Sequence, residues 1–177
     1  MPVKPRLHIF EKHSYLWAFE ADLTNYKKAI DTLSKYKNVE VIQKGLWSSD
    51  SLLVFYNVGE TDSTFIQVNS TTEGFTLVSP KVKKTIVPVT SLDEFFHRTN
   101  SALPTYIKMD IEGSEENALL GSKNIIKKAK PKLAIAVDHK PEDIYKLTNI
   151  LHSMRNDYYF TLRQYDHGFT ETVLYGV

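Results

Sequence analysis

Short apolar runs alternate with amphipathic stretches along most of this 177-residue chain. Residues 15–19 and 132–137 are almost continuously apolar, which is typical of strands buried on both faces of a parallel sheet. Between such runs, apolar positions recur at helical spacing, as in residues 24–37, where Asp22 or Thr24 can cap a helix. The alternation predicts an α/β fold in which helices cover a parallel sheet.

The remaining segments complete this pattern. We expect further strands, helices and a closing antiparallel hairpin at these positions: strands at 39–43, 52–56, 64–68, 83–89 and 105–109, helices at 91–98, 114–120 and 141–154, with Ser91 and Ser114 as caps and Pro141 in a first turn, and the hairpin at 158–165 and 171–177. Residues 57–81, rich in Thr, Ser and Asn, are expected to form an irregular flap. No repeat or linker divides the chain, so we expect one domain over 1–177.

Composition excludes several classes of function. The 22 basic and 21 acidic side chains nearly cancel, which argues against a protein that binds nucleic acid through bulk charge. The absence of cysteine excludes disulfides, thiolate zinc sites and a cysteine nucleophile. No apolar run approaches the roughly 20 residues of a membrane helix, and no signal peptide is visible. We therefore expect a cytoplasmic protein without a membrane span.

Polar side chains follow three of the expected strands: Glu20, Asp110 with Glu112, and Asp138 with His139. In open α/β sheets, ligands bind at the carboxyl ends of the strands, so we expect these groups to converge on one crevice. A neutral imidazole at His139 could accept a hydroxyl proton near pH 7. The alternatives are a histidine bonded to a nearby carbonyl and, for Glu20, a solvated carboxylate near a helix N-terminus.

Asp110 and Glu112 lie two residues apart, so on extended chain they would point the same way. Either they face a ligand, or Glu112 charges the next helix N-terminus while Asp110 binds a loop amide. Asp110 with Asp138 could hold a divalent cation through oxygen ligands. Because no third oxygen ligand is evident, we expect no metal.

Four segments together suggest a family: Ala18-Phe-Glu-Ala21, Lys44-Gly-Leu-Trp47, Lys108-Met-Asp-Ile-Glu-Gly-Ser-Glu115 and Glu171-Thr-Val-Leu-Tyr175. They resemble the FkbM-type methyltransferases over about residues 15–177, and residues 108–115 look like the family's K-[ILM]-D-[VI]-E-G-x-E signature. The resemblance implies a Rossmann-like class I methyltransferase sheet. It also implies S-adenosylmethionine-dependent O-methylation of a sugar, polysaccharide or secondary metabolite.

The resemblance gives the strand-end residues expected roles: Asp110 and His139 catalytic; Glu20, Gly45, Trp47 and Asp110 near the cofactor; Glu112, Asp138 and Arg163 near the acceptor. Glu20 would bind the two ribose hydroxyls, and Trp47 would pack on the adenine. A large aromatic residue at Trp47 is also typical of a core. Arg163 and His167, near the hairpin, could touch an anionic or sugar acceptor.

One part of the family pattern is absent. The family's first strand ends in D-x-G-A with a further glycine, in a loop around the methionine end of the cofactor, but no glycine precedes Gly45 here. Residues 5–13 then represent either the remnant of the following helix or a short strand at 6–10 that could pair only antiparallel. We expect the first strand to be missing, as in a truncated copy, a mis-assigned gene start or a fragment needing a partner.

A missing central strand would leave the strands ending at Glu20 and Asp110 without a neighbour. Each unpaired buried backbone group costs roughly 1–3 kcal/mol. Self-association is therefore one expectation, because unpaired strand edges favour it. The alternative to an enzyme is a non-catalytic relic or binding module of the same fold.

Overall fold

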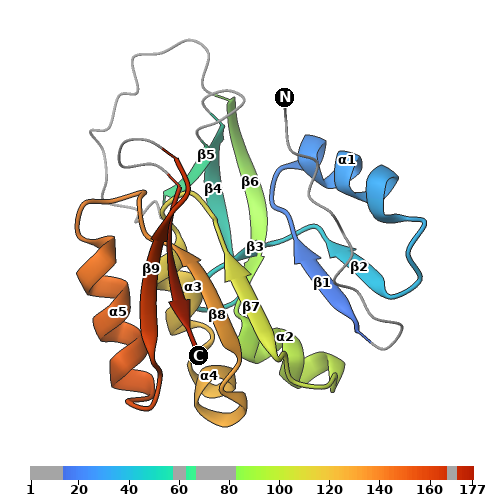
Figure 1. Ribbon diagram of the computed structural model, residues 1–177. Helices are drawn as coiled ribbons and strands as arrows, with labels where there is room; N and C mark the ends of the chain where they lie inside the picture. Colours follow the sequence, from blue (N-terminus) through green and yellow to red (C-terminus); the bar gives the residue numbers. More distant parts are fainter. Residues whose placement is uncertain (1–13, 58–62, 67–82, 167–170) are drawn as a thin grey trace. The chain divides into compact units, whose positions relative to one another are not determined.

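A computed structural model describes residues 14–57, 63–66, 83–166 and 171–177 (Figure 1). The expected remnant at 5–13, most of the expected flap at 57–81, and His167 lie outside these residues. The chain divides into two compact units, residues 1–45 and 46–177. None of the helices in the described segments combines the length and apolar character that crossing a bilayer requires.

The first unit contains a parallel pair of strands and one helix. Strand β1 (Leu16–Phe19) pairs with β2 (Val39–Ile42), and helix α1 (Leu23–Leu33) connects them. Asp22 caps the helix, because its Oδ1 accepts hydrogen bonds from the amides of Thr24 and Asn25 at 2.8 and 2.9 Å. No side chain of α1 is buried.

Helix α1 ends at Leu33, so the expected end at residue 37 is wrong. The backbone has to turn back early because Asn38 is already tied to the start of β1. Its carbonyl accepts a hydrogen bond from Leu16 N at 2.9 Å, and its side-chain amide donates to Ser14 O. These bonds set the parallel register, in which Leu16 pairs with Val39.

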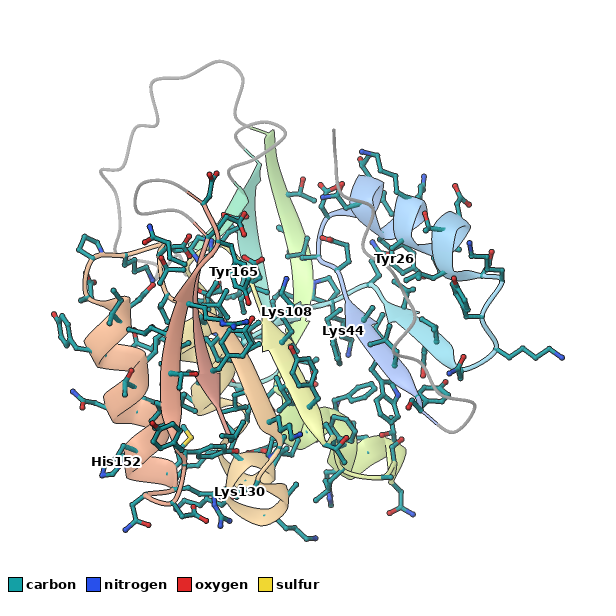
Figure 2. The ribbon with its side chains drawn as sticks, in the orientation of Figure 1. Tyr26, Lys44, Lys108, Lys130, His152 and Tyr165 are labelled. Atoms are coloured by element: carbon teal, nitrogen blue, oxygen red, sulfur yellow. The ribbon has the colours of Figure 1, made fainter. Side chains whose placement is uncertain are left out.

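The larger unit holds a four-stranded mixed sheet in the order β7-β8-β10-β9, with these bounds: β7 Tyr106–Met109, β8 Lys132–Ala136, β9 Phe160–Gln164 and β10 Thr172–Gly176. Strands β7 and β8 are parallel, and β10 is antiparallel to both β8 and β9, which confirms the expected hairpin. The carboxyl ends of β7, β8 and β9 therefore share one edge. Figure 2 shows Lys130, which precedes β8, and Tyr165, which follows β9, at opposite ends of this sheet.

In this unit, α5 (Asp143–Met154) packs against α3 (Glu115–Leu120) and α4 (Lys123–Ala129). With β8 they supply a core whose fully buried members include Leu119, Ile126, Ile135, Leu147 and Leu151. The sequence reading did not separate α4 from α3. The break falls at Gly121, where an added Cβ would lie 2.1 Å from the Trp47 carbonyl oxygen, so the chain turns in close contact with another segment.

Two expected helix starts need correction. Ser114 precedes α3, but its side chain makes no capping hydrogen bond, and its buried hydroxyl has no hydrogen-bond partner within the described segments. Pro141 does not enter the first turn of α5, because Glu142 is the N-cap and the helix begins at Asp143. The sequence therefore predicts where these two helices lie better than it predicts their N-terminal capping interactions.

A second sheet runs in the order β3-β6-β4-β5, with these bounds: β3 Gly45–Leu46, β4 Ser51–Asn57, β5 Ser63–Ile66 and β6 Lys83–Thr90. Strand β4 pairs antiparallel with both β5 and β6. Helix α2 (Leu92–Thr99) follows β6, and the Ser91 hydroxyl accepts a hydrogen bond from Glu94 N at 3.1 Å, as its capping pattern predicted.

The mixed α/β class is confirmed, but the described strands form three separate hydrogen-bonded sheets. Within the described residues, β1 pairs only with β2, and β7 pairs only with β8. These are the two strands that the sequence expected to flank a missing first strand. The missing strand itself stays a prediction.

Candidate functional site

The carboxyl ends of β7 and β8 hold a close group of titratable side chains. His139 follows β8, and four carboxylates lie within 4.0 Å of its ring nitrogens. Its Nε2 is 3.3 Å from Glu112 Oε2 and 3.9 Å from Asp110 Oδ1. Its Nδ1 is 3.3 Å from Glu115 Oε1 and 4.0 Å from Asp138 Oδ1. Because β7 and β8 are adjacent and parallel, their ends bring these groups together.

A tight turn, rather than extended chain, brings Asp110 and Glu112 to the same nitrogen. Glu112 has a φ of 55° and Gly113 a φ of 85°, so two consecutive residues adopt left-handed conformations. Such a conformation is unfavourable for a glutamate and easy for glycine. The expected convergence of the two carboxylates is found, but the expected reason for it, side chains alternating along an extended segment, is wrong.

Glu115 is the member of the cluster that sequence reasoning did not single out. It is the first residue of α3, its side chain is only 1% exposed, and its Oε1 accepts a hydrogen bond from Ile111 N at 2.8 Å. Its other oxygen, Oε2, is buried without a hydrogen-bond partner in the described part of the chain. The sequence contains one indication of its role: Glu115 is the last residue of segment 108–115, and it lies at a helix N-terminus, which favours negative charge.

The carboxylates change the protonation of His139. Interaction with Glu115 is the largest cause that raises the pKa of His139, to about 9, with further contributions from Glu112 and Asp138, against the opposing effect of burial. At neutral pH the side chain is therefore an imidazolium. The expected neutral imidazole, ready to accept a proton near pH 7, is not the form that this environment favours.

The rim of the cluster contains further polar contacts. Lys108 Nζ lies 3.2 Å from Asp110 Oδ2, the carboxylate oxygen that His139 does not approach (Figure 2 labels Lys108). Asp138 Oδ2 accepts a hydrogen bond from Thr172 N at 3.4 Å, which ties the end of β8 to β10. These contacts hold one oxygen of each aspartate.

Arg163 is exposed near the end of β9, at the same edge of the sheet, but β10 lies between β9 and β8. Its neighbour is Tyr165, whose pKa is lowered by hydrogen bonds with Tyr175 and Arg163. The two tyrosine hydroxyls are 2.8 Å apart. Arg163 thus belongs to a separate polar group on the hairpin, and its acceptor contact stays a prediction.

The expected cofactor residues lie in other surroundings. Glu20 follows β1 in the first unit, its Oε1 accepts a hydrogen bond from Asp22 N at 2.8 Å, and burial raises its pKa. Gly45 is buried in β3. Trp47 is 7% exposed and packs in a buried cluster with Leu53 and Val89, which favours the core alternative over adenine stacking. Convergence of Glu20 with the cluster at His139 stays a prediction.

Comparison with known proteins identifies the family. The family model of the methyltransferase FkbM domain matches residues 6–165. The chain belongs to the FkbM methyltransferase family. A crystal structure of methyltransferase FkbM from Methylobacillus flagellatus KT is similar over 92% of this chain, with a TM-score of 0.69 and 27% sequence identity. No curated protein matches the sequence.

The resemblance inferred from residues 18–21, 44–47, 108–115 and 171–175 is thereby confirmed, and FkbM membership implies S-adenosylmethionine as the methyl donor. This FkbM-family chain spans 36% of the length of the solved relative. Three of the carboxylates around His139, those of Asp110, Glu112 and Glu115, come from the signature segment 108–115.

Proposed function

We propose that this FkbM-family chain methylates a hydroxyl group of a sugar, polysaccharide or secondary metabolite. When bound, S-adenosylmethionine supplies an electrophilic methyl group on a sulfonium. In the overall reaction, the acceptor oxygen bonds to the methyl carbon, the carbon–sulfur bond breaks, and the hydroxyl proton is released, leaving a methyl ether and S-adenosylhomocysteine. The observation that supports this proposal most directly is the group of three carboxylates that the family's signature segment places around the imidazole of His139.

Asp110 and His139 are the proposed catalytic residues. The exposed Asp110 carboxylate accepts the hydrogen bond of the acceptor hydroxyl, which orients the oxygen and promotes loss of its proton. His139, 3.9 Å from Asp110 Oδ1, orients that carboxylate. Glu112, Asp138 and Arg163 are proposed to contact the acceptor. This assignment replaces a neutral histidine base with a carboxylate, in keeping with the raised pKa of His139.

Glu20, Gly45, Trp47 and Asp110 are proposed to bind the donor. Glu20 fits the part best, because a partly buried carboxylate at a strand end can accept hydrogen bonds from two ribose hydroxyls. Its bond to Asp22 N fixes the carboxylate beside the helix N-terminus and leaves further acceptor capacity on the oxygens. The buried Trp47 supports this role less well than Glu20 does.

A second candidate is a non-catalytic binding module of the same fold. The observation that favours it is the raised pKa of His139, which leaves the imidazole protonated and unable to accept a proton at neutral pH. The two candidates differ in whether the chain binds the cofactor and transfers its methyl group.

Calorimetric titration with S-adenosylhomocysteine, in buffer containing EDTA, tests donor binding. We expect saturable binding that Glu20→Ala weakens by about 1.5–3 kcal/mol, the value of a hydrogen bond to a charged group. Glu40→Ala is the matched control, because Glu40 is an exposed carboxylate on the neighbouring strand β2. No heat at millimolar ligand would contradict the enzyme proposal for this chain, and an unchanged affinity in Glu20→Ala would contradict the role of Glu20.

Transfer of labelled methyl from S-adenosylmethionine to a panel of hydroxylated sugars and polyketides tests catalysis. We expect Asp110→Asn to lower kcat about 10²–10⁴-fold, the usual contribution of a positioned proton acceptor. Asp31→Asn, an exposed carboxylate on α1, should leave the rate unchanged. Binding of the donor without transfer to any acceptor would favour the binding module.

A further inference from the structure

Two carboxylate oxygens converge on Nε2 of His139. One oxygen from Asp110, one from Glu112 and a nitrogen of His139 all lie within 4.8 Å of one another. Ions bound at about 2.0–2.2 Å by such atoms hold neighbouring ligands roughly 3–3.5 Å apart. The Glu112–His139 separation of 3.3 Å already fits, and the 3.9 Å from Asp110 to His139 needs only a small side-chain rotation. Both carboxylates are exposed, so such a rotation is available.

A second observation that favours a metal site concerns the other ring nitrogen, Nδ1. Glu115 Oε1 lies 3.3 Å from Nδ1 of His139, and its side chain is 99% buried, with Oε2 unpartnered among the described residues. Histidines that bind metals usually donate their second ring N–H to a carboxylate, which fixes the tautomer and directs the opposite nitrogen at the ion. A buried carboxylate lies behind Nδ1 and two exposed carboxylates lie before Nε2, so the groups of this arrangement are in place. Nδ1 and Glu115 Oε2 are both buried without a hydrogen-bond partner among the described residues, and a small shift of either group would complete the bond.

The neighbouring cation Lys108 pairs with the other oxygen of Asp110. Lys108 pairs with Asp110 Oδ2 at 3.2 Å, whereas it is Oδ1 that faces His139. Asp138 faces Nδ1, not Nε2, and its Oδ2 accepts the Thr172 amide. From the sequence, a cation between Asp110 and Asp138 lacks a third oxygen ligand, and the expectation is no metal. The structure instead supplies Glu112 and His139 as further ligands, because the left-handed turn at Glu112 brings its carboxylate back.

We propose that Asp110, Glu112 and His139 bind one divalent transition-metal ion, with Glu115 as the residue that positions the imidazole. The mixed donor set favours this class of ion, since imidazole suits zinc and its neighbours, whereas carboxylates suit manganese and magnesium. Three protein ligands leave coordination positions open, as at catalytic metal sites.

What the ion does rests on the proposed function. The acceptor hydroxyl oxygen would occupy an open position, and the ion would lower the pKa of that hydroxyl so that its proton leaves to solvent before or during methyl transfer. Binding of the ion itself is independent of the methyl donor.

Titration of the EDTA-stripped, then desalted, 177-residue chain with Mn²⁺, followed by electron paramagnetic resonance of free Mn²⁺, tests the site. We expect one saturable site, with affinity lowered at least tenfold in Asp110→Asn and in His139→Gln. Glu115→Gln, which touches no metal, should weaken binding about 10–100-fold, as loss of an outer-sphere carboxylate does. Glu116→Gln is the matched control, because the next residue on α3 pairs with Lys146 at 2.6 Å and does not face His139.

Circular dichroism of each variant separates loss of ligand from loss of fold, and Glu112→Gln on the exposed side serves where a buried substitution unfolds the chain. Absence of binding at millimolar Mn²⁺ and millimolar Zn²⁺ would overturn the proposal, as would binding that survives unchanged in Asp110→Asn and His139→Gln. Because the S-adenosylhomocysteine titration is run with EDTA, failure of the metal site and failure of methyl-donor binding give different results.

Discussion

The proposed acceptor-activating residues and the proposed donor-binding residue Glu20 lie in regions that are stabilised differently. The group around His139 follows two adjacent strands of a packed sheet, and a 99% buried carboxylate lies 3.3 Å from its imidazole. Glu20 follows a two-stranded sheet joined by a helix with no buried side chain, and its carboxylate accepts a hydrogen bond from a backbone amide two residues away. The first region is organised around a buried core, and the second by the hydrogen bonds of a helix cap and a strand pair.

The difference indicates which functional groups each region can preorganise. Several charges can be kept close together only where a buried framework opposes their repulsion, as β8, α3 and α5 do. A ribose-binding carboxylate needs only one position, which a cap and a strand end can supply. Substitutions that remove packing should therefore separate the two regions most clearly.

The largest expected effect comes from truncating the core. Ile135→Ala, at a fully buried position of β8, should lower the free energy of unfolding by about 2–5 kcal/mol through lost burial and the cavity left behind. Ile30→Ala on α1 is the matched control, since Ile30 is 38% exposed and should cost less than about 1 kcal/mol. Urea unfolding followed by fluorescence measures both, and equal costs would remove the distinction between the regions.

The fold was largely predictable because apolar runs mark buried strands. The run at 132–137 became β8, and the hairpin followed from two strands around Asp166-His-Gly. Errors fell at helix ends, such as Leu33 and Gly121, where a contact from a distant segment decides the boundary. Periodicity within one segment contains no information about such contacts.

The sequence predicts most residues of the site but not their conformations or contacts. Strand-end logic found Asp110, Asp138 and His139, because parallel neighbours share an edge. It could not find that Glu115 turns inward or that Glu112 adopts a left-handed conformation, since both depend on how the loop closes over His139. The protonation of His139 follows from those two positions and was missed with them.

A smaller effect concerns Tyr158, whose hydroxyl donates a 2.7 Å hydrogen bond to the buried Pro131 carbonyl of the packed region. Burial raises the pKa of Tyr158 to about 12, above the value of about 10 in an unfolded chain. The native state therefore holds the proton longer, and the stability from this group is complete below pH 10 and is lost as pH rises toward 12.

Tyr158→Phe should cost about 1–3 kcal/mol at pH 8, because the carbonyl loses its buried donor, and the gap from the wild-type protein should narrow between pH 10 and 12. Unfolding in urea across this pH range measures the gap. Tyr159→Phe, on an exposed neighbouring tyrosine, is the control. A constant gap would show that Tyr158 titrates as an exposed phenol does.

The smallest expected effect is a substitution that costs stability in the first unit but not in the larger one. Asp22→Ala should destabilise the first unit by about 1 kcal/mol, because α1 loses the side-chain bonds to Thr24 N and Asn25 N. Ser114→Ala, at the equivalent position before α3, should be neutral or stabilising, since it removes a buried hydroxyl without a hydrogen-bond partner among the described residues. Helix content by circular dichroism with urea unfolding measures both. An equal loss of stability in Ser114→Ala and Asp22→Ala would contradict this expectation. It would show that side-chain capping stabilises α3 as much as it stabilises α1.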